Sequence, residues 1–332
     1  MAATAGLRRL AWAAAAFALF VIVFGAFVRL SNAGLSCPDW PTCYGKLTWP
    51  TQSHEVATAN AAFPDRPVEG AKAWREQAHR ILVGGLSLFT LGLAVWSWRR
   101  REDLGRLTAI PLAATLLIVF QAALGMWTVT LKLLPAVVMA HLLGGMALFA
   151  LLAYTALRLG AHAGAESDRV LHRMTAAGIA LLAVQIALGG WTSSNYAALA
   201  CGNDFPTCLG AWWPATDFRE GFVLWRGVGV NYEGGVLDTA ARSAIQIAHR
   251  IGALIVFAWL SWLAVAAARR PALRGSALAI ALLLLLQVTL GISNVVFGLP
   301  LGVAIAHNGV AALLLLALLA LMVRTRDERR ET

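Results

Sequence analysis

Long apolar stretches recur along the whole chain, and they constrain its fold more than any other feature of the sequence. Each is about 20 residues long, which is enough for a helix to cross a bilayer. The eight stretches cover residues 10–30, 78–98, 107–130, 135–158, 174–193, 243–267, 276–297 and 301–323. Because lipid offers the backbone no hydrogen-bonding partner, stretches this long and uniformly apolar must be helices rather than barrel strands. We therefore predict an all-α integral membrane protein with eight transmembrane helices.

Charged residues are scarce and unevenly placed. They make up 13% of the chain, against about 25% in a typical soluble domain. Arginines gather in five short segments on one predicted side of the membrane, residues 8–9, 99–106, 158–173, 269–274 and 324–330. An excess of basic residues marks the cytoplasmic side, so we expect both termini to be cytoplasmic and the long loops to face the periplasm of a bacterial inner membrane. The net charge of +10 then favours anionic membrane lipid, and we expect no nucleic-acid binding.

The four cysteines fall in the two longest predicted outer loops. Cys37 and Cys43 lie in the first outer loop, and Cys201 and Cys208 lie in the third. Thiols on the periplasmic side are normally oxidised, so the simplest prediction is two short-range disulfides, Cys37–Cys43 and Cys201–Cys208. The alternative is a zinc site of four cysteines, which would require the two loops to meet.

The two halves of the chain repeat one another. Four landmarks recur in the same order: Cys37–Cys43 with Cys201–Cys208, His79-Arg80 with His249-Arg250, Gln121–Gly125 with Gln287–Gly291, and Ala140-His141 with Ala306-His307. Their offsets all lie between 164 and 170 residues, which is hard to obtain by chance. Each copy has an even number of spans, so we predict two parallel-repeat four-helix bundles, residues 1–160 and 174–332, joined by an inner connector at 161–173.

Four histidines lie inside predicted spans, two in each half: His79, His141, His249 and His307. Each is about five or six residues from its outer loop, or roughly 8 Å inside at 1.5 Å per residue. One such histidine would most simply bond a neighbouring helix, but four at matched depth indicate iron ligands. Zinc is a poor alternative, because no intramembrane cysteine accompanies either pair. The pattern predicts one bis-histidine heme site in each half, toward the outer face.

Glutamine and glycine form a second pattern within the spans. Gln-x-x-Leu-Gly occurs at residues 121–125, 185–189 and 287–291. We interpret it as close helix packing, with direct contact to a ligand as the alternative. Paired glycines follow the histidines only in the first half, at Gly84-Gly85 and Gly144-Gly145. This difference suggests the hypothesis that the first pocket is roomier and holds a bulkier ligand.

The clearest difference between the copies is a carboxylate. Glu76 lies three residues before His79, and the matching residue before His249 is Gln246. Residues three apart share a helix face, so Glu76 could act as a general acid or base, or stabilise cationic character, at a heme bound by His79. The alternative is a solvated carboxylate paired with a neighbouring arginine.

An arginine follows the first histidine of each half. Arg80 comes directly after His79, and Arg250 comes directly after His249. Guanidinium groups present a planar fork of donors that suits carboxylates, so both are candidate partners for heme propionates. Snorkelling of the side chain to the lipid headgroups is the competing interpretation.

Together these motifs resemble the heme A synthase family of bacteria, which is similar to the mitochondrial enzyme. The residues that carry the resemblance are the run Gly34–Cys43, the element Glu76-x-x-His79-Arg80, the span with His141, and their second-half echoes. The resemblance implies an oxidoreductase that converts the C8 methyl of heme O to the formyl group of heme A for cytochrome oxidase. It implies heme O synthase (a farnesyltransferase) and cytochrome oxidase assembly factors as partners, and it names no electron acceptor.

The resemblance also implies roles for individual residues. His79 and His141 would hold the substrate heme, His249 and His307 would hold heme b, and Glu76 would be the catalytic carboxylate. The first cysteine pair would take part in redox steps, with a purely structural loop staple as the alternative. A different class of protein, a di-heme b membrane electron-transfer protein, would hold two fixed hemes and leaves the difference between Glu76 and Gln246 unexplained.

Overall fold

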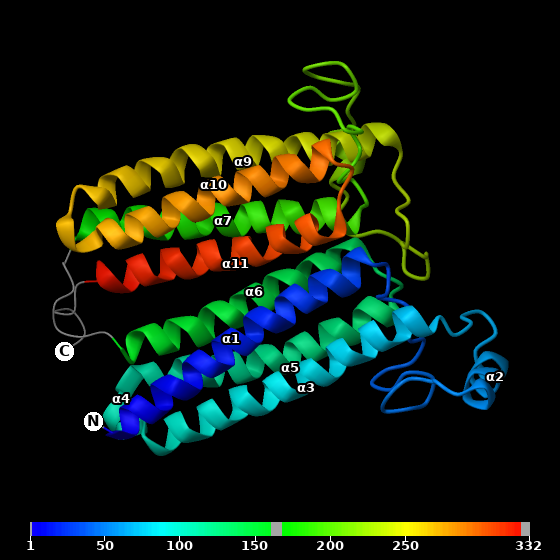
Figure 1. The fold of residues 1–332 in the computed structure, drawn as a ribbon, viewed down its shortest axis with the longest axis horizontal. Helices are drawn as coiled ribbons and strands as arrows, with labels where there is room; N and C mark the ends of the chain where they lie inside the picture. Colours follow the sequence, from blue (N-terminus) through cyan, green and yellow to red (C-terminus); the bar gives the residue numbers. More distant parts are fainter. Residues whose placement is uncertain (1, 161–167, 327–332) are drawn as a thin grey trace.

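The computed structural model describes residues 2–160 and 168–326, and within these ranges its regular secondary structure is helical apart from two isolated β-bridges (Figure 1). Eight helices are long and apolar enough to cross a membrane. They are α1 (Ala2–Leu30), α3 (Gly70–Arg99), α5 (Ala109–Thr130), α6 (Pro135–Arg158), α7 (Arg169–Ser194), α9 (Thr239–Ala268), α10 (Arg274–Val296) and α11 (Leu301–Arg324). Each contains or closely matches one predicted stretch, so the prediction of a multi-pass, all-α membrane protein is confirmed.

Several of these helices are longer than the apolar stretches that predicted them. α3 begins at Gly70 rather than near residue 78, and α9 begins at Thr239 rather than near residue 243. The added turns are polar and continue the helix beyond the membrane-like stretch. α7 begins at Arg169, so part of the predicted connector at 161–173 is helix, while residues 161–167 lie outside the described residues.

Side-chain caps fix the starts of two of the spanning helices. The Asp168 carboxylate accepts a hydrogen bond from the Leu171 backbone N–H at 2.9 Å, and Asp238 accepts one from Ala241 at 2.8 Å. Such caps satisfy N–H groups that have no partner within the helix. The bond from Leu171 lowers the pKa of Asp168, and the pairing with Arg270 acts in the same direction.

Short helices occupy the connections between the spans. They are α2 (Ser53–Ala62), α4 (Arg101–Leu104), η1 (Gly105–Thr108), α8 (Phe218–Gly221) and η2 (Pro271–Leu273). Glu55 in the first turn of α2 accepts hydrogen bonds from Lys46 and from the backbone N–H groups of Thr51 and Gln52. These bonds, that of Lys46 first, lower the pKa of Glu55 to about 2. The carboxylate therefore stays charged and holds the start of α2 at neutral pH.

The spanning helices form two sets that follow the two halves of the chain. In the first set α1 contacts α3 and α6, and α5 contacts the same two helices. In the second set α7 contacts α9 and α11, and α10 contacts the same two. Figure 1 shows the sets side by side, joined through α1 and α6 from one set and α7 and α11 from the other. The predicted division into two repeated four-helix bundles stays a prediction.

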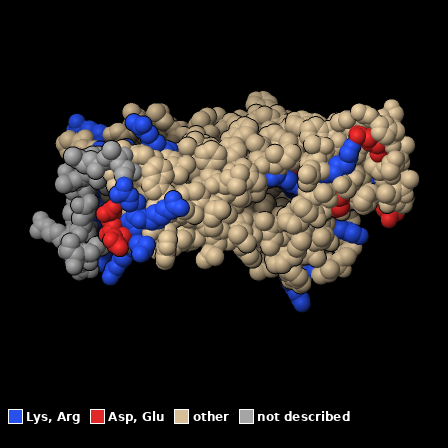
Figure 2. Space-filling model, turned by 90° about the horizontal axis from the view of Figure 1, so that it is seen from below, with Lys and Arg blue, Asp and Glu red and all other residues tan. Residues whose placement is uncertain are grey.

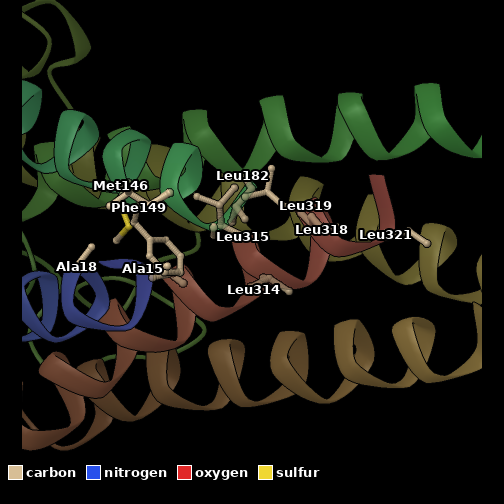
Figure 3. Close-up of a cluster of buried hydrophobic side chains, with 14 of the residues drawn as sticks. Ala15, Ala18, Met146, Phe149, Leu182, Leu314, Leu315, Leu318, Leu319 and Leu321 are labelled. Atoms are coloured by element: carbon tan, nitrogen blue, oxygen red, sulfur yellow. The ribbon is translucent and has the colours of Figure 1, made fainter. Parts of the chain in front are cut away.

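The buried core is continuous across the two sets. Figure 3 shows Ala15 and Ala18 of α1, Phe149 of α6, Leu182 of α7 and Leu315 of α11 in one cluster. Each of these side chains is buried. Small side chains on α1 let neighbouring helices approach closely, which is the usual way for helices to pack where lipid removes the hydrophobic drive between them. The shared core fixes the two sets of helices relative to each other.

Charged side chains lie near the two ends of the molecule and leave a broad uncharged band between them (Figure 2). The start of α1 and the end of α11 lie at the same end of the bundle (Figure 1). Basic side chains gather at this end (Figure 2). An uncharged band is what a membrane-embedded surface requires. The assignment of the end with the start of α1 to the cytoplasm stays a prediction.

Candidate heme sites

The histidines of each half come from helices that stand across from each other. His79 is on α3 and His141 is on α6, with α1 and α5 between these two helices. His249 on α9 and His307 on α11 have the same relation, with α7 and α10 between them. The imidazoles of His79 and His249 face α1 and α7, and those of His141 and His307 face α5 and α10. All four imidazoles therefore lie among the helices of their own set.

The distance of the histidines from the helix starts differs from the prediction. His141 and His307 each lie six residues after the first residue of their helix, as expected. His79 lies nine residues after the start of α3, and His249 lies ten after the start of α9. At 1.5 Å per residue, six residues span about 9 Å, nine about 14 Å and ten about 15 Å. The expectation of five or six residues is wrong for α3 and α9, because both helices continue beyond their apolar stretch.

A glycine on a neighbouring helix faces every one of the four imidazoles. Gly25 of α1 faces His79, Gly125 of α5 faces His141, Gly189 of α7 faces His249, and Gly291 of α10 faces His307. A Cβ atom at the first, third or fourth of these glycines would lie between 3.0 and 3.2 Å from a ring carbon, and at the second 3.5 Å. The backbone thus leaves room for the imidazole at all four positions.

The sequence analysis predicted open space at a different set of glycines. It singled out those that follow the histidines on the same helix, such as Gly144. A Cβ atom at Gly144 would lie 1.7 Å from the amide nitrogen of Gln121, so that space is filled by a side chain. At Gly84 and Gly145 nothing lies within 4 Å of such a Cβ atom, so the hypothesis that the paired glycines make the first pocket roomier stays a prediction. The useful signal was the glycine that ends Gln-x-x-Leu-Gly, together with Gly25, which lies at the repeat offset from Gly189.

The glutamines of the same motif contact histidines in the second half. The amide nitrogen of Gln185 lies 3.0 Å from Nδ1 of His249, and that of Gln287 lies 3.2 Å from Nε2 of His307. Gln185 thus bonds a neighbouring helix, as the packing interpretation expects, and the alternative of direct contact to a ligand stays a prediction. In the first half, Nδ1 of His79 and of His141 is buried without a hydrogen-bonding partner.

These features match the requirements of a bis-histidine heme. A heme needs two imidazoles on opposite sides of its iron and a space between helices that is free of side chains. Unpartnered ring nitrogens match the first need, and the facing glycines leave room between the helices for the imidazoles. The described residues contain no group of three or more His, Cys, Asp or Glu side chains suited to a metal ion held by protein ligands alone. The residues present therefore fit heme better than zinc.

Glu76 is held in the first half by the arginine one turn later. Its Oε1 accepts a hydrogen bond from Nε of Arg80 at 3.1 Å, and each side chain is 10% exposed. The alternative of a solvated carboxylate paired with an arginine is therefore right about the pairing and wrong about the solvation, since Glu76 is buried. Nη1 of Arg80 also donates to the backbone carbonyls of Asp39 at 2.8 Å and Thr42 at 2.6 Å. Arg80 thus joins Glu76 to the first disulfide loop.

Arg250 binds the second disulfide loop in a related way. It donates to the carbonyl oxygens of Asp204, Pro206 and Thr207 at distances between 2.8 and 3.1 Å. With Gln246 in place of a glutamate, Nε of Arg250 is buried and has no partner, and neither has the amide oxygen of Gln246. Sequence reasoning missed this loop-anchoring role, which both arginines share. Arg80 keeps one buried, unpartnered nitrogen, Nη2.

The predicted disulfides are confirmed. Cys37 pairs with Cys43 and Cys201 pairs with Cys208, with Cα–Cα distances of 4.7 and 4.5 Å. Because each cysteine is bonded within its own loop, the alternative of a shared four-cysteine zinc site is wrong.

An aspartate organises each disulfide loop. The Asp39 carboxylate accepts from the backbone N–H groups of Tyr44 and Gly45 at 2.6 and 2.8 Å, and Asp204 accepts from Gly210 at 2.6 Å. Gly45 and Gly210 both have positive φ, a conformation that glycine adopts without strain. Burial alone would raise the pKa of Asp39, but the bonds from Thr42 and from the loop backbone outweigh it and lower that pKa.

Comparisons with known proteins agree with this geometry. A family model described as cytochrome oxidase assembly protein matches residues 8–319. The chain belongs to this family. It is 48% identical over 309 residues to heme A synthase of Shewanella oneidensis, covering 92% of each chain. It is 31% identical to heme A synthase of Caulobacter vibrioides, covering 94% of each, and 26% identical to that of Bacillus licheniformis, covering 87% of this chain and 86% of the relative.

The predicted resemblance to heme A synthases is therefore confirmed over nearly the whole chain. Relatives with this one name do not favour the alternative of a di-heme b electron-transfer protein. The assignment of individual residues to ligand and catalytic roles stays a prediction, and it rests on the geometry described above.

Proposed function

We propose that this chain is a heme A synthase that oxidises the C8 methyl of heme O to the formyl group of heme A in a bacterial inner membrane. One observation carries the proposal beyond the family membership. A buried carboxylate, Glu76, stands one turn before His79 in the first half, and the equivalent residue of the second half is Gln246. A duplicated scaffold that carries one reactive group suggests one reaction site and one cofactor site.

The two histidine pairs would then hold two different hemes. His79 and His141 would hold the substrate heme, while His249 and His307 would hold heme b as the resident cofactor. Bound heme b would supply a redox-active iron. Arg80 Nη2 and Arg250 Nε are buried donors without partners, and heme propionates are carboxylates that would satisfy them. Both arginines would bind the disulfide loops and the propionates at once.

Glu76 would act at the substituent that is oxidised. It lies on the same face of α3 as His79, where residues three apart have Cβ atoms about 5–6 Å from each other. Its ion pair with Arg80 holds the carboxylate in one position. A carboxylate fixed at the heme rim can exchange a proton with the reacting group or stabilise positive charge that develops there. A neutral glutamine such as Gln246 can neither exchange the proton nor stabilise the charge in this way.

Orientation and partners follow from the same proposal. The arginine-rich helix ends would lie in the cytoplasm, and the disulfide loops and heme sites would lie toward the periplasm. Heme O synthase, a farnesyltransferase, would supply the substrate, and cytochrome oxidase assembly factors would receive the product. The name of the matching family, cytochrome oxidase assembly protein, supports this destination.

The identity of the bound hemes tests the proposal directly. The protein would be purified from membranes that also contain heme O synthase, and its hemes would be identified by pyridine hemochrome spectra and HPLC of the extracted pigment. We expect heme B together with heme O, an alcohol intermediate or heme A. Heme B alone, in amounts that fill both sites, would overturn the proposal and favour an electron carrier.

A further inference from the structure

The contact between Gln185 and His249 joins α7 to α9 inside the second half. The Gln185 amide nitrogen lies 3.0 Å from Nδ1 of His249 and also donates to the His249 carbonyl oxygen at 3.0 Å. The amide oxygen of Gln185 is buried and has no hydrogen-bonding partner. One polar side chain thus lies against both the ring and the backbone of a candidate iron ligand.

A glycine one turn after the histidine makes this contact possible. A Cβ atom at Gly252 would lie 2.2 Å from the Gln185 amide oxygen and 3.0 Å from Leu188. Any larger residue at position 252 would therefore displace the glutamine. Gln185 and Gly252 form a matched pair, in which the small residue on α9 accommodates the long polar residue on α7.

The equivalent pair in the first half is apolar. Val21 lies four residues before Gly25, just as Gln185 lies four residues before Gly189, and Val21 is buried. Leu82 lies three residues after His79, just as Gly252 lies three residues after His249. The two positions therefore differ together between the halves. The second half has a large residue and a small one, and the first half has two medium apolar residues. Nδ1 of His79 accordingly has no partner.

We infer that Gln185 is a positioning residue that fixes the His249 imidazole and makes the second half a site of permanent heme binding. The pair Val21 and Leu82 leaves His79 without such a partner, and this makes the first half a site of heme exchange. The statement about exchange rests on the proposed function, in which the first half must take up heme O and release heme A. The statement about Gln185 stands on the contact alone.

The physical basis is the second ring nitrogen of an iron-bound histidine. When one ring nitrogen binds iron, the other carries a proton, and a hydrogen-bond acceptor for that proton fixes the ring and raises its basicity. Rotation of the Gln185 amide would bring its unpartnered oxygen to Nδ1 of His249, where it would accept this proton, in exchange for the bond that the amide nitrogen donates to the His249 carbonyl oxygen. Loss of such a partner typically weakens metal binding about 10- to 100-fold. The equivalent position on α1, Val21, has no acceptor to offer.

The test transplants the first-half pair into the second half. The variant Gln185→Val with Gly252→Leu removes the amide and moves side-chain bulk from α7 to α9, with a net gain in volume. Transfer of heme B from the purified full-length protein to apomyoglobin would be followed by absorbance. The electron paramagnetic resonance (EPR) spectrum and the midpoint potential of the low-spin heme would be recorded in parallel. We expect transfer at least about 10-fold faster than in the unmodified protein, with shifted g-values and a higher potential.

Two further variants separate positioning from packing. Gln185→Glu keeps an acceptor beside Nδ1, so we expect slow transfer and a lower potential, opposite in direction to the double variant. Gln121→Val removes a first-half glutamine of the same motif, the counterpart of Gln287. Gln121 makes no bond to a histidine, so heme B transfer should not change. A merely structural role for Gln185 would not shift the potential in opposite directions.

Each outcome decides the inference. Equal transfer rates and identical EPR spectra in the double variant and the unmodified protein would overturn it. Loss of heme B from the double variant and from Gln185→Glu alike would also overturn it, because an acceptor at position 185 would then make no difference. Loss from the double variant with retention in Gln185→Glu supports it. Failure of the proposed function is a separate result, since it is detected in the unmodified protein by the identity of its extracted hemes.

Discussion

The N-terminal ends of α3 and α9 share one arrangement of contacts, and they differ where chemistry is expected. In both, an arginine directly after the histidine donates to backbone carbonyls of a disulfide loop. In α3 the same arginine also holds Glu76, whereas in α9 the corresponding atoms of Gln246 and Arg250 are buried without partners. The shared contacts hold the loop over the helix end. The unshared carboxylate is therefore the better candidate for catalysis.

The largest expected effect comes from removing that carboxylate. We predict that Glu76→Gln lowers heme A formation by at least about 100-fold, because a positioned acid or base contributes roughly 10²–10⁴-fold. Both hemes should stay bound, since Arg80 keeps its bonds to Asp39 and Thr42. HPLC of heme from cells that express the variant with heme O synthase measures the product. The matched control, Gln246→Glu, should keep its activity. A fully active Glu76→Gln enzyme would contradict the assignment.

The second prediction concerns which heme is lost when one histidine of each half is replaced. We expect His249→Ala to lose its heme B almost completely, because an iron ligand is gone and the facing Gly189 cannot replace it. His79→Ala should keep heme B and lose the bound substrate heme. Pyridine hemochrome analysis of the purified variants gives both contents. Equal loss of heme B from the two variants would show that the halves do not hold different hemes.

A smaller effect is expected from filling the space in front of one imidazole. A Cβ atom at Gly189 would lie 3.2 Å from a ring carbon of His249, so Gly189→Val must displace the ring. Overpacking of this kind costs about 1–3 kcal/mol, so we predict heme B affinity about 10-fold lower or more. Gly84→Val is the control, because nothing lies within 4 Å of a Cβ atom there. If both variants bound heme B equally well, the facing glycines would not shape the site.

Features that depend on local sequence were the ones predicted correctly. The eight spans follow from the length of apolar stretches, and each disulfide closes a short loop within one segment. The candidate histidines could be found because their type and spacing repeat. The first residues of α3 and α9 were predicted too late in the chain, because hydrophobicity marks where the lipid begins and not where a helix starts.

Contacts that join distant segments left no such signal. Arg80 binds carbonyl groups 38 and 41 residues earlier in the chain, and every residue has a carbonyl, so no residue type marks the partner. The pairing of Gln185 with His249 spans 64 residues and depends on Gly252, which is ordinary in a membrane helix. Alignment of the two halves, rather than any single motif, would have pointed to it, because Val21 and Leu82 change together with Gln185 and Gly252.

The smallest predicted effect concerns the loop that Arg80 anchors. The pKa of Asp39 in the folded protein lies below its ordinary value of 3.8, so its carboxylate stabilises the loop above that value, and the stabilisation is lost as the pH falls through the lowered pKa. Asp39→Asn should remove the effect at neutral pH, because a neutral amide is a weaker acceptor for the N–H groups of Tyr44 and Gly45. Hydrogen–deuterium exchange of residues 37–46 at neutral pH measures this loosening, with peptides from α11 as the internal reference. Equal exchange in the variant and the unmodified protein would show that Cys37–Cys43 and Arg80 hold the loop without Asp39. The same measurement on residues 201–211 should be unaffected by the substitution, which tests whether the two loops, alike in design, are held independently.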